Sequence, residues 1–308
     1  MSTQADNGKA FEWAVGVAFE KQTRFVMSAS EYAKQAQKAF DSLAEKKQKQ
    51  LQTSASIAIE HIINKERAFF SSARDGRITF NSDAAGQKGD VRDVILTLGD
   101  KTLGVSCKHN HEALKHSRLS ATVDFIKKWG MDASGCSSEY WSRVRPLFVE
   151  LKLIQVGSGR TKLWNELENK AERFYWPLLD AWADEIRKLC EVSPQKEAEL
   201  CRAIIAYIIG KQDFYKVICE GSKLIQIQAY NFNGSLATKR TKYPDSILAI
   251  NSKNGGQYSK TITFNHGYSL NFRIHSASSR VEPSLKFDIT AIGLPTSEVY
   301  QQTLDVPS

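Results

Sequence analysis

The sequence predicts an α/β (α+β) fold with N-terminal helices, a β-hairpin, a helical middle region and a β-rich C-terminal third. Three patterns lead to this prediction. Apolar residues recur at helical spacing over residues 7–25, two β-rich runs flank a turn near residue 100, and residues 214–292 are rich in β-forming residues. A length of 308 residues allows one elaborated domain or two closely joined ones. An apolar content of 42% with 25% charged residues excludes wholesale disorder and collagen-like sequence.

The N-terminal part is expected to be helical. Residues 7–25 should form an amphipathic helix that Asn7 can cap, because apolar side chains recur at helical spacing. These side chains are Phe11, Val15, Ala18 and Phe19. Residues 29–70, rich in Ala, Gln, Lys and Glu, should form one or two more helices. A short strand is expected at 77–80 and a Gly-containing loop at 83–89.

The next elements are expected to form a β-hairpin. Residues 94–98 (Val-Ile-Leu-Thr-Leu) and 102–107 (Thr-Leu-Gly-Val-Ser-Cys) have strand composition, and Gly99–Lys101 between them has turn composition. Because so short a connection suits only antiparallel neighbours, the two runs should pair directly.

The rest of the chain is expected to turn from helices to strands. Residues 111–128 return to helical spacing, as does most of 138–210. Three prolines and a Gly-Ser-Gly loop punctuate the longer stretch. They are Pro146, Pro177, Pro194 and residues 157–159. Residues 214–292 should supply strands separated by turns. The strands are expected at 223–228, 246–250, 261–264, 269–274 and 285–292, with turn signals at 254–256 and 265–267.

The positive charge is concentrated in two segments. Lys and Arg number 42 and Asp and Glu 34, a formal net charge of +8. Residues 101–128 carry six basic and two acidic residues, and residues 239–286 carry eight and two, so the remainder of the chain nets to about −2. Two separated basic segments suit two walls of a groove that follows nucleic-acid phosphates. The alternative is chance clustering on an ordinary solvated surface.

Membrane insertion and disulfide bonding are not expected. Residues 1–9 have no apolar signal-peptide core, and the longest near-apolar run, 203–209, is far shorter than the ~20 residues that a membrane span needs. Five cysteines without a C-x-x-C pair support neither a disulfide framework nor a four-thiolate zinc site. We therefore expect a cytoplasmic protein.

A carboxylate and an ammonium are expected to meet at the open end of the hairpin. An antiparallel register puts Asp93 opposite approximately Cys107, with its carboxylate near Ser106 and Lys108. This geometry suits metal-assisted phosphodiester hydrolysis. Carboxylate and carbonyl oxygens would hold Mg²⁺, while the metal and Lys108 would stabilise charge and help to deprotonate the attacking water. On spacing alone, a surface ion pair is the alternative.

Longer stretches around this pair resemble a known family. Residues 89–96 (Gly-Asp-Val-Arg-Asp-Val-Ile-Leu) and 104–108 (Gly-Val-Ser-Cys-Lys) resemble the Asp…(Asp/Glu)-x-Lys signature of the PD-(D/E)XK nucleases. The extension to residue 120 is more specific and resembles the HaeIII-type family of type II restriction endonucleases. Residues 7–12 and 284–288 also resemble that family, so the similarity spans most of the chain.

The resemblance implies a restriction-endonuclease-like mixed β-sheet core flanked by helices. It also implies a Mg²⁺-dependent endonuclease that cuts double-stranded DNA at GGCC to blunt ends in a prokaryotic cytoplasm. Residues 1–130 would form the nuclease core, 131–212 a helical region and 213–308 a β-rich DNA-recognition region, all in one integrated unit. A cognate cytosine methyltransferase would be a functional partner without direct contact. Blunt cutting at a palindrome suggests a homodimer, although one subunit could act twice.

The resemblance assigns roles by position. Asp93 matches the metal-binding Asp because an aliphatic strand follows it directly, and Asp90 is the runner-up for this catalytic role. Lys108 matches the signature Lys. These residues would carry the catalysis together with one further carboxylate.

That further carboxylate is missing from its usual position. Two residues before Lys108 the signature has Asp or Glu, whereas this chain has Ser106, a poor Mg²⁺ ligand. Either one metal suffices or another carboxylate takes part. Glu12 on the N-terminal helix is the first candidate, as catalytic residue and metal ligand, and Glu112 is the second. The backbone carbonyl of Cys107 would be a further metal ligand.

DNA contacts are expected from both basic segments. A G/C target favours Arg or Lys donors to guanine and acceptors for the cytosine amino group. The candidate DNA-binding residues are His109, Asn110, His111, Lys115, His116, Arg118, Lys239, Arg240, Lys242 and Arg273. Two other functions stay open. The chain could be a repair or nicking nuclease on the same core, or a catalytically inactive DNA-binding protein in which Ser106 marks the loss.

Overall fold

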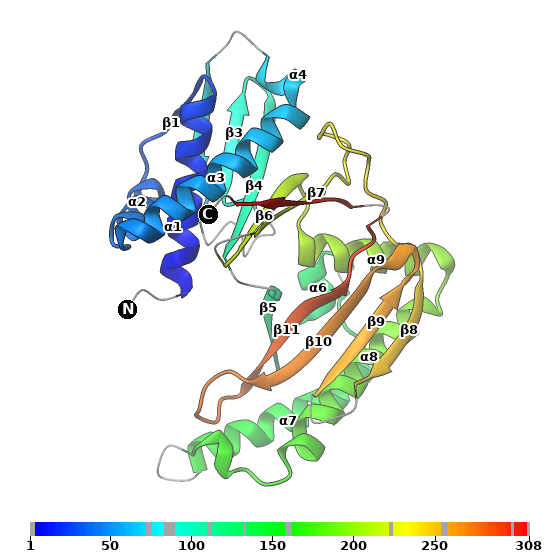
Figure 1. The fold of residues 1–308 in the computed structure, drawn as a ribbon. Coiled ribbons are helices and arrows are strands. Elements are labelled where there is room, and N and C mark those ends of the chain that lie inside the picture. Colours follow the sequence, from blue (N-terminus) through cyan, green and yellow to red (C-terminus); the bar gives the residue numbers. More distant parts are fainter. Residues whose placement is uncertain are drawn as a thin grey trace. The chain divides into compact units, whose positions relative to one another are not determined.

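The computed structural model describes residues 4–71, 75–82, 90–109, 113–131, 134–157, 162–221, 224–253, 258–296 and 299–306. These residues form two compact units, each assembled from segments far apart in the chain (Figure 1). Unit 1 contains residues 1–111, 210–242 and 296–308, and unit 2 contains 112–209 and 243–295. The loop expected at 83–89 and the turn expected at 254–256 lie outside the described residues. No described helix is long and apolar enough to cross a membrane.

Unit 1 contains a mixed β-sheet with helices. Its elements are α1 (Gln4–Gln22), β1 (Phe25–Met27), α2 (Glu31–Asp41), α3 (Glu45–Lys65), α4 (Arg67–Phe70), β2 (Gly76–Phe80), β3 (Val94–Leu98), β4 (Lys101–His109), β6 (Phe214–Glu220), β7 (Leu224–Tyr230) and β12 (Tyr300–Asp305). The strand order is β1-β2-β3-β4-β6-β7-β12. The pairs β1–β2 and β4–β6 are parallel, and the other neighbours are antiparallel. The expected mixed sheet flanked by helices is therefore confirmed.

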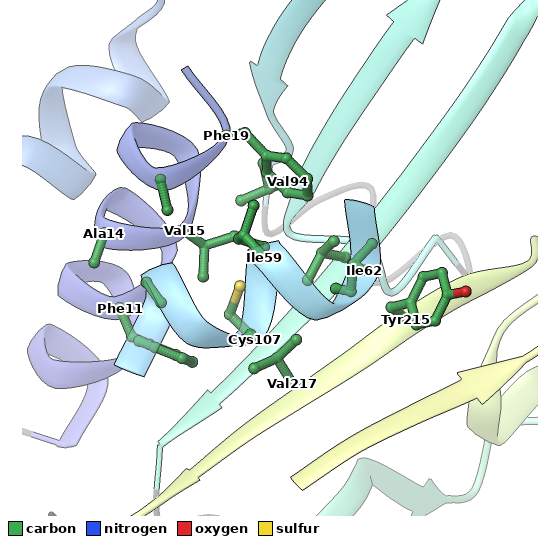
Figure 2. Packing of buried hydrophobic residues seen from close by; sticks show 14 of the residues in the cluster. Phe11, Ala14, Val15, Phe19, Ile59, Ile62, Val94, Cys107, Tyr215 and Val217 are labelled. Carbon is green, nitrogen blue, oxygen red and sulfur yellow. The ribbon is translucent and has the colours of Figure 1, made fainter. Parts of the chain in front are cut away.

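Helices α1 and α3 cover one face of this sheet. Figure 2 shows Phe11 and Val15 of α1 and Ile59 of α3 packed toward Cys107 and Val217 of the central strands. All five side chains are at most 3% exposed. Burying one large apolar side chain contributes about 1.5–3 kcal/mol, so this packing fixes the helices on the sheet. Since side chains alternate along a strand, the residues next to Cys107 and Val217 face the opposite side of the sheet.

The N-terminal helix and the hairpin differ slightly from the sequence expectation. Helix α1 begins at Gln4, so Asn7 lies inside it and does not cap it. The hairpin turn has two residues, because Lys101 pairs with Leu98. Gly99, at φ +62°, provides the left-handed backbone that this tight turn needs.

Unit 2 contains a separate antiparallel sheet with helices. Its elements are β5 (Ala113–Ser120), α6 (Phe125–Trp129), α7 (Ser138–Gly157), η1 (Trp164–Glu166), η2 (Ala171–Tyr175), α8 (Trp176–Cys190), α9 (Pro194–Ile209), β8 (Ile247–Ser252), β9 (Ser259–Phe264), η3 (Asn265–Gly267), β10 (Ser269–Ser276) and β11 (Ser284–Gly293). The strand order is β5-β11-β10-β9-β8. The core centres on Trp182 of α8, whose ring lies 4.6 Å from that of Phe272 and 5.1 Å from that of Phe287.

The helix expected over residues 111–128 is wrong. Of the described residues in that range, 113–120 form β5, which pairs antiparallel with β11, and the only helix is α6, which begins at Phe125. The reason is tertiary: the register sets Leu119 beside Leu285 and buries both, which outweighs a weak local preference. Pro146, expected to punctuate the helical stretch, lies inside α7. The β-rich C-terminal third is divided, with β6, β7 and β12 in the first sheet and β8 to β11 in the second.

Candidate active site

The carboxylate of Asp93 and the ammonium of Lys108 meet beside the hairpin. Asp93 lies just before β3, where its backbone N–H donates to the Val105 carbonyl at 2.8 Å. Because Val94 pairs with Val105, Asp93 comes opposite Ser106, one residue from the position expected from a longer turn. Its Oδ2 accepts hydrogen bonds from Ser106 Oγ at 3.1 Å, Cys107 N at 2.6 Å and Lys108 Nζ at 3.3 Å. The expected meeting of Asp93 with Ser106 and Lys108 is confirmed.

One oxygen of this carboxylate is held and the other is open. All three donors converge on Oδ2, and in the described part of the chain none donates to Oδ1. Ser106 is 2% exposed, and its hydroxyl donates to the Asp93 carboxylate and holds it in place. The residue that replaces the signature acid therefore acts here as a hydrogen-bond donor to Asp93.

The donor set fits a hard divalent cation with few protein ligands. Mg²⁺ prefers oxygen, keeps several waters and is commonly held by one or two carboxylates together with substrate phosphates. The open oxygen of Asp93 meets that need. Among the described residues, no group of three or more His, Cys, Asp or Glu forms a ready-made metal cluster.

Lys108 is held in its charged form. Burial works to lower the pKa of Lys108, but the Asp93 carboxylate opposes it and Glu12 of α1 adds to that attraction, so the pKa is raised. The ammonium therefore stays protonated at neutral pH and can stabilise negative charge. Glu12, half-buried on α1, lies close enough to influence both Lys108 and Cys107 electrostatically.

Cys107 contributes only its backbone to this site. Its thiol is 3% exposed and faces α1 and α3, and burial raises its pKa well above the ordinary value (Figure 2). The backbone N–H holds Asp93 Oδ2 at 2.6 Å.

Asp90 has a different partner. Its two oxygens accept from Arg92 Nε at 2.7 Å and from Arg92 Nη2 at 2.8 Å. Burial tends to raise the pKa of Asp90, but the Arg92 guanidinium outweighs it and the pKa is lowered. The structure thus joins Asp93 to Lys108 and Asp90 to Arg92.

Gly104→Ala is expected to lower the free energy of unfolding by about 1–3 kcal/mol, because a Cβ there would lie 2.0 Å from Arg92 Cδ. The clash would displace Arg92 and loosen its pair with Asp90. Urea unfolding measures the loss. Gly8→Ala is the matched control, since a Cβ at Gly8 meets no atom within 4 Å. A Gly104→Ala midpoint equal to that of the wild type would contradict this account.

The candidate DNA-binding residues divide between the units. Lys239, Arg240 and Lys242 are exposed in unit 1, and Arg240 Nε donates to the Phe232 carbonyl at 3.0 Å. Arg118 on β5 and Arg273 on β10 are exposed in unit 2. Arg118 Nη1 donates to Glu282 Oε2 at 3.1 Å and to the Ser284 hydroxyl, at the start of β11, at 3.0 Å.

The remaining candidates are described in part or not at all. Asn110, His111 and Glu112 lie outside the described residues. His109 ends β4, and Lys115 and His116 belong to β5, but their side chains lie outside what the structure describes.

Sequence reasoning missed Lys216 on β6. This side chain is 8% exposed and lies directly across from Ser106 in the parallel pairing of β4 and β6. The available signal was a single lysine inside the apolar run Phe214–Cys219. The pairing of β6 with β4 could not be inferred, because about a hundred residues separate the strands.

Two comparisons with known proteins bear on this site. The family model described as HaeIII restriction endonuclease matches residues 8–295. The type II restriction enzyme HaeIII of Haemophilus aegyptius is 31% identical over 321 residues, which cover 97% of each chain. No solved structure matches the chain.

Proposed function

This chain belongs to the HaeIII restriction endonuclease family and is thus a sequence-specific DNA endonuclease, and we propose that it cuts duplex DNA at GGCC to blunt ends with Mg²⁺. The observation that carries the proposal is the Asp93 carboxylate, held through Oδ2 next to Lys108 with Oδ1 open. The match over residues 8–295 includes this whole cluster.

The proposed catalytic roles follow from the contacts. Asp93 Oδ1, the Cys107 carbonyl and, from α1, Glu12 would hold the metal ion. When bound, a divalent cation supplies charge neutralisation at the phosphoryl group and lowers the pKa of a water. The hydrogen bonds from Ser106 and Cys107 keep Asp93 in one orientation. Lys108 stays protonated and stabilises the charge that develops on the phosphodiester in the transition state. Asp90 is kept as the runner-up for the metal-binding role.

DNA binding is proposed for the candidate residues of the two basic segments. Those between residues 109 and 118 would contact phosphates beside the scissile bond, and those on the later segments would neutralise phosphates or read guanine. The first group is His109, Asn110, His111, Lys115, His116 and Arg118, and the second is Lys239, Arg240, Lys242 and Arg273. The protein would act as a homodimer that cuts both strands, on DNA in a prokaryotic cytoplasm. A cytosine methyltransferase would protect the same site in the host DNA.

One plasmid of known sequence tests the proposed specificity. Purified protein with Mg²⁺ is expected to yield the discrete fragments that its GGCC sites define, and none with EDTA. Prior methylation of the cytosines in GGCC should protect the plasmid. Discrete fragments from another site would reject GGCC. Cleavage only at mismatches or structured DNA would favour a repair or nicking nuclease, and salt-sensitive binding without cleavage would favour an inactive DNA-binding protein.

A further inference from the structure

A lysine that the proposed mechanism does not use lies on the same sheet face as Lys108. Cys107 and Val217 point toward α1 and α3 in Figure 2, so their strand neighbours point to the opposite face. Lys108 is one such neighbour, and Lys216 is another. Ser106 pairs with Lys216 and Lys108 pairs with Ile218, so the two lysines stand two positions apart on neighbouring strands of this face.

Lys216 lies in a buried polar row across three central strands. Ser106 on β4 pairs with Lys216, and Lys216 pairs with Gln228 on β7. The three residues are 2%, 8% and 8% exposed. Ser106 holds Asp93, and Gln228 Oε1 accepts a hydrogen bond from Tyr230 at 2.9 Å. Buried polar side chains in the middle of a sheet destabilise the fold unless they bind a ligand or form hydrogen bonds with one another.

The ammonium of Lys216 has no counter-ion among the described residues. No carboxylate there pairs with it and no hydrogen bond satisfies it, in contrast to Lys108 beside Asp93. Burial, assisted by Lys108, lowers the pKa of Lys216 to about 8, which still leaves the group mostly charged at neutral pH. A buried cation of this kind lacks an anion, and the cluster next to it is the one proposed to act on a phosphodiester.

We propose that Lys216 is a second catalytic cation, whose ammonium binds a non-bridging oxygen of the scissile phosphodiester beside Lys108. The proposal rests on the hydrolysis proposed at Asp93 and Lys108. In the free protein Lys216 is destabilising, and it gains its counter-ion when the phosphate arrives. Strain stored at a site and relieved by the ligand is a general feature of active sites.

The test compares Lys216→Met with Lys216→Arg. Met keeps an unbranched side chain, one heavy atom shorter, without the charge. We expect the single-turnover cleavage rate of Lys216→Met at saturating DNA to fall about a hundredfold, as for loss of one transition-state charge donor. Its thermal midpoint should equal or exceed that of the wild type, because an unpaired buried charge is removed. Lys216→Arg should recover at least about a tenth of the wild-type rate, since it restores a cation.

Lys49→Met is the matched control. Lys49 belongs to the same unit and its side chain is 73% exposed. The Lys49→Met variant should therefore cleave DNA at the wild-type rate. Wild-type cleavage by Lys216→Met would overturn the proposal. A lowered thermal midpoint together with lost cleavage would assign Lys216 a structural role and overturn it as well.

The salt dependence of DNA binding separates this inference from the proposed function. In metal-free buffer, the slope of log affinity against log salt should fall by about one counter-ion in Lys216→Met. If the wild type binds DNA but does not cut it, the proposed function fails and this slope alone decides on Lys216. An unchanged slope would then reject the phosphate contact.

Discussion

Replacing Asp93 by asparagine is expected to slow DNA cleavage at least about a thousandfold while the folded protein still binds DNA. The substitution keeps the shape of the side chain and removes its charge. Oδ2 now accepts from Ser106, the Cys107 N–H and Lys108, so the neutral amide would weaken the hold on Lys108 and remove the open anionic oxygen. Single-turnover cleavage of a GGCC duplex with Mg²⁺ measures the rate.

Asp41→Asn is the matched control, because Asp41 is exposed at the end of α2 in the same unit. It should cleave like the wild type. DNA binding without metal and the thermal midpoint should change little in Asp93→Asn, which separates loss of chemistry from loss of folding. Lys108→Ala is expected to abolish cleavage as well, because it leaves the phosphodiester and Asp93 without their cation. Normal cleavage by Asp93→Asn would remove Asp93 from the active site.

Replacing Trp182 by alanine is expected to cost about 3–5 kcal/mol of the free energy of unfolding. The side chain is fully buried in unit 2, with its ring 4.6 Å from Phe272 and 5.1 Å from Phe287. Alanine would open a cavity between α8 and the sheet, lined by aromatic rings that cannot collapse into it. Urea unfolding followed by circular dichroism measures the loss.

Trp182→Phe is the control for this experiment. It keeps an aromatic ring at the centre of the core and removes the indole N–H, which has no hydrogen-bond partner among the described residues. The smaller ring should therefore cost less than half as much as alanine. Equal losses in both variants would show that the indole as a whole, and not the ring packing, stabilises unit 2.

The sequence predicted elements whose signals are local. The two strands 94–98 and 102–107 and the turn between them form the hairpin that the composition indicates, and the helices of 138–210 follow their apolar spacing. Strand β5 was mistaken for a helix because its partner, β11, is more than 160 residues away in sequence. Strands β1 and β12 were missed for the same reason. They are the two edge strands of the first sheet, and each pairs with a strand far away in sequence, β2 and β7 respectively.

In the candidate site, too, contacts within one hairpin could be predicted from the sequence and contacts between distant strands could not. Asp93 and Lys108 could be paired from the sequence because one hairpin carries both of them. The role of Ser106 could not be predicted from the sequence, since only the folded geometry shows that its hydroxyl donates a hydrogen bond to Asp93. Lys216 depends on a parallel pairing of β4 and β6 that brings together residues 110 positions apart, Ser106 and Lys216.

By itself, the sequence determined the family, the helix-and-hairpin order and the pair of charges at the end of the hairpin, because these follow from motifs and from contacts between close neighbours in the chain. Only the tertiary structure decided which oxygen of Asp93 stays open, that Asp90 pairs with Arg92, and that the buried Lys216 faces the same side of the sheet as Lys108. Strand pairing sets these features, and its energy comes from contacts between segments that no local pattern records.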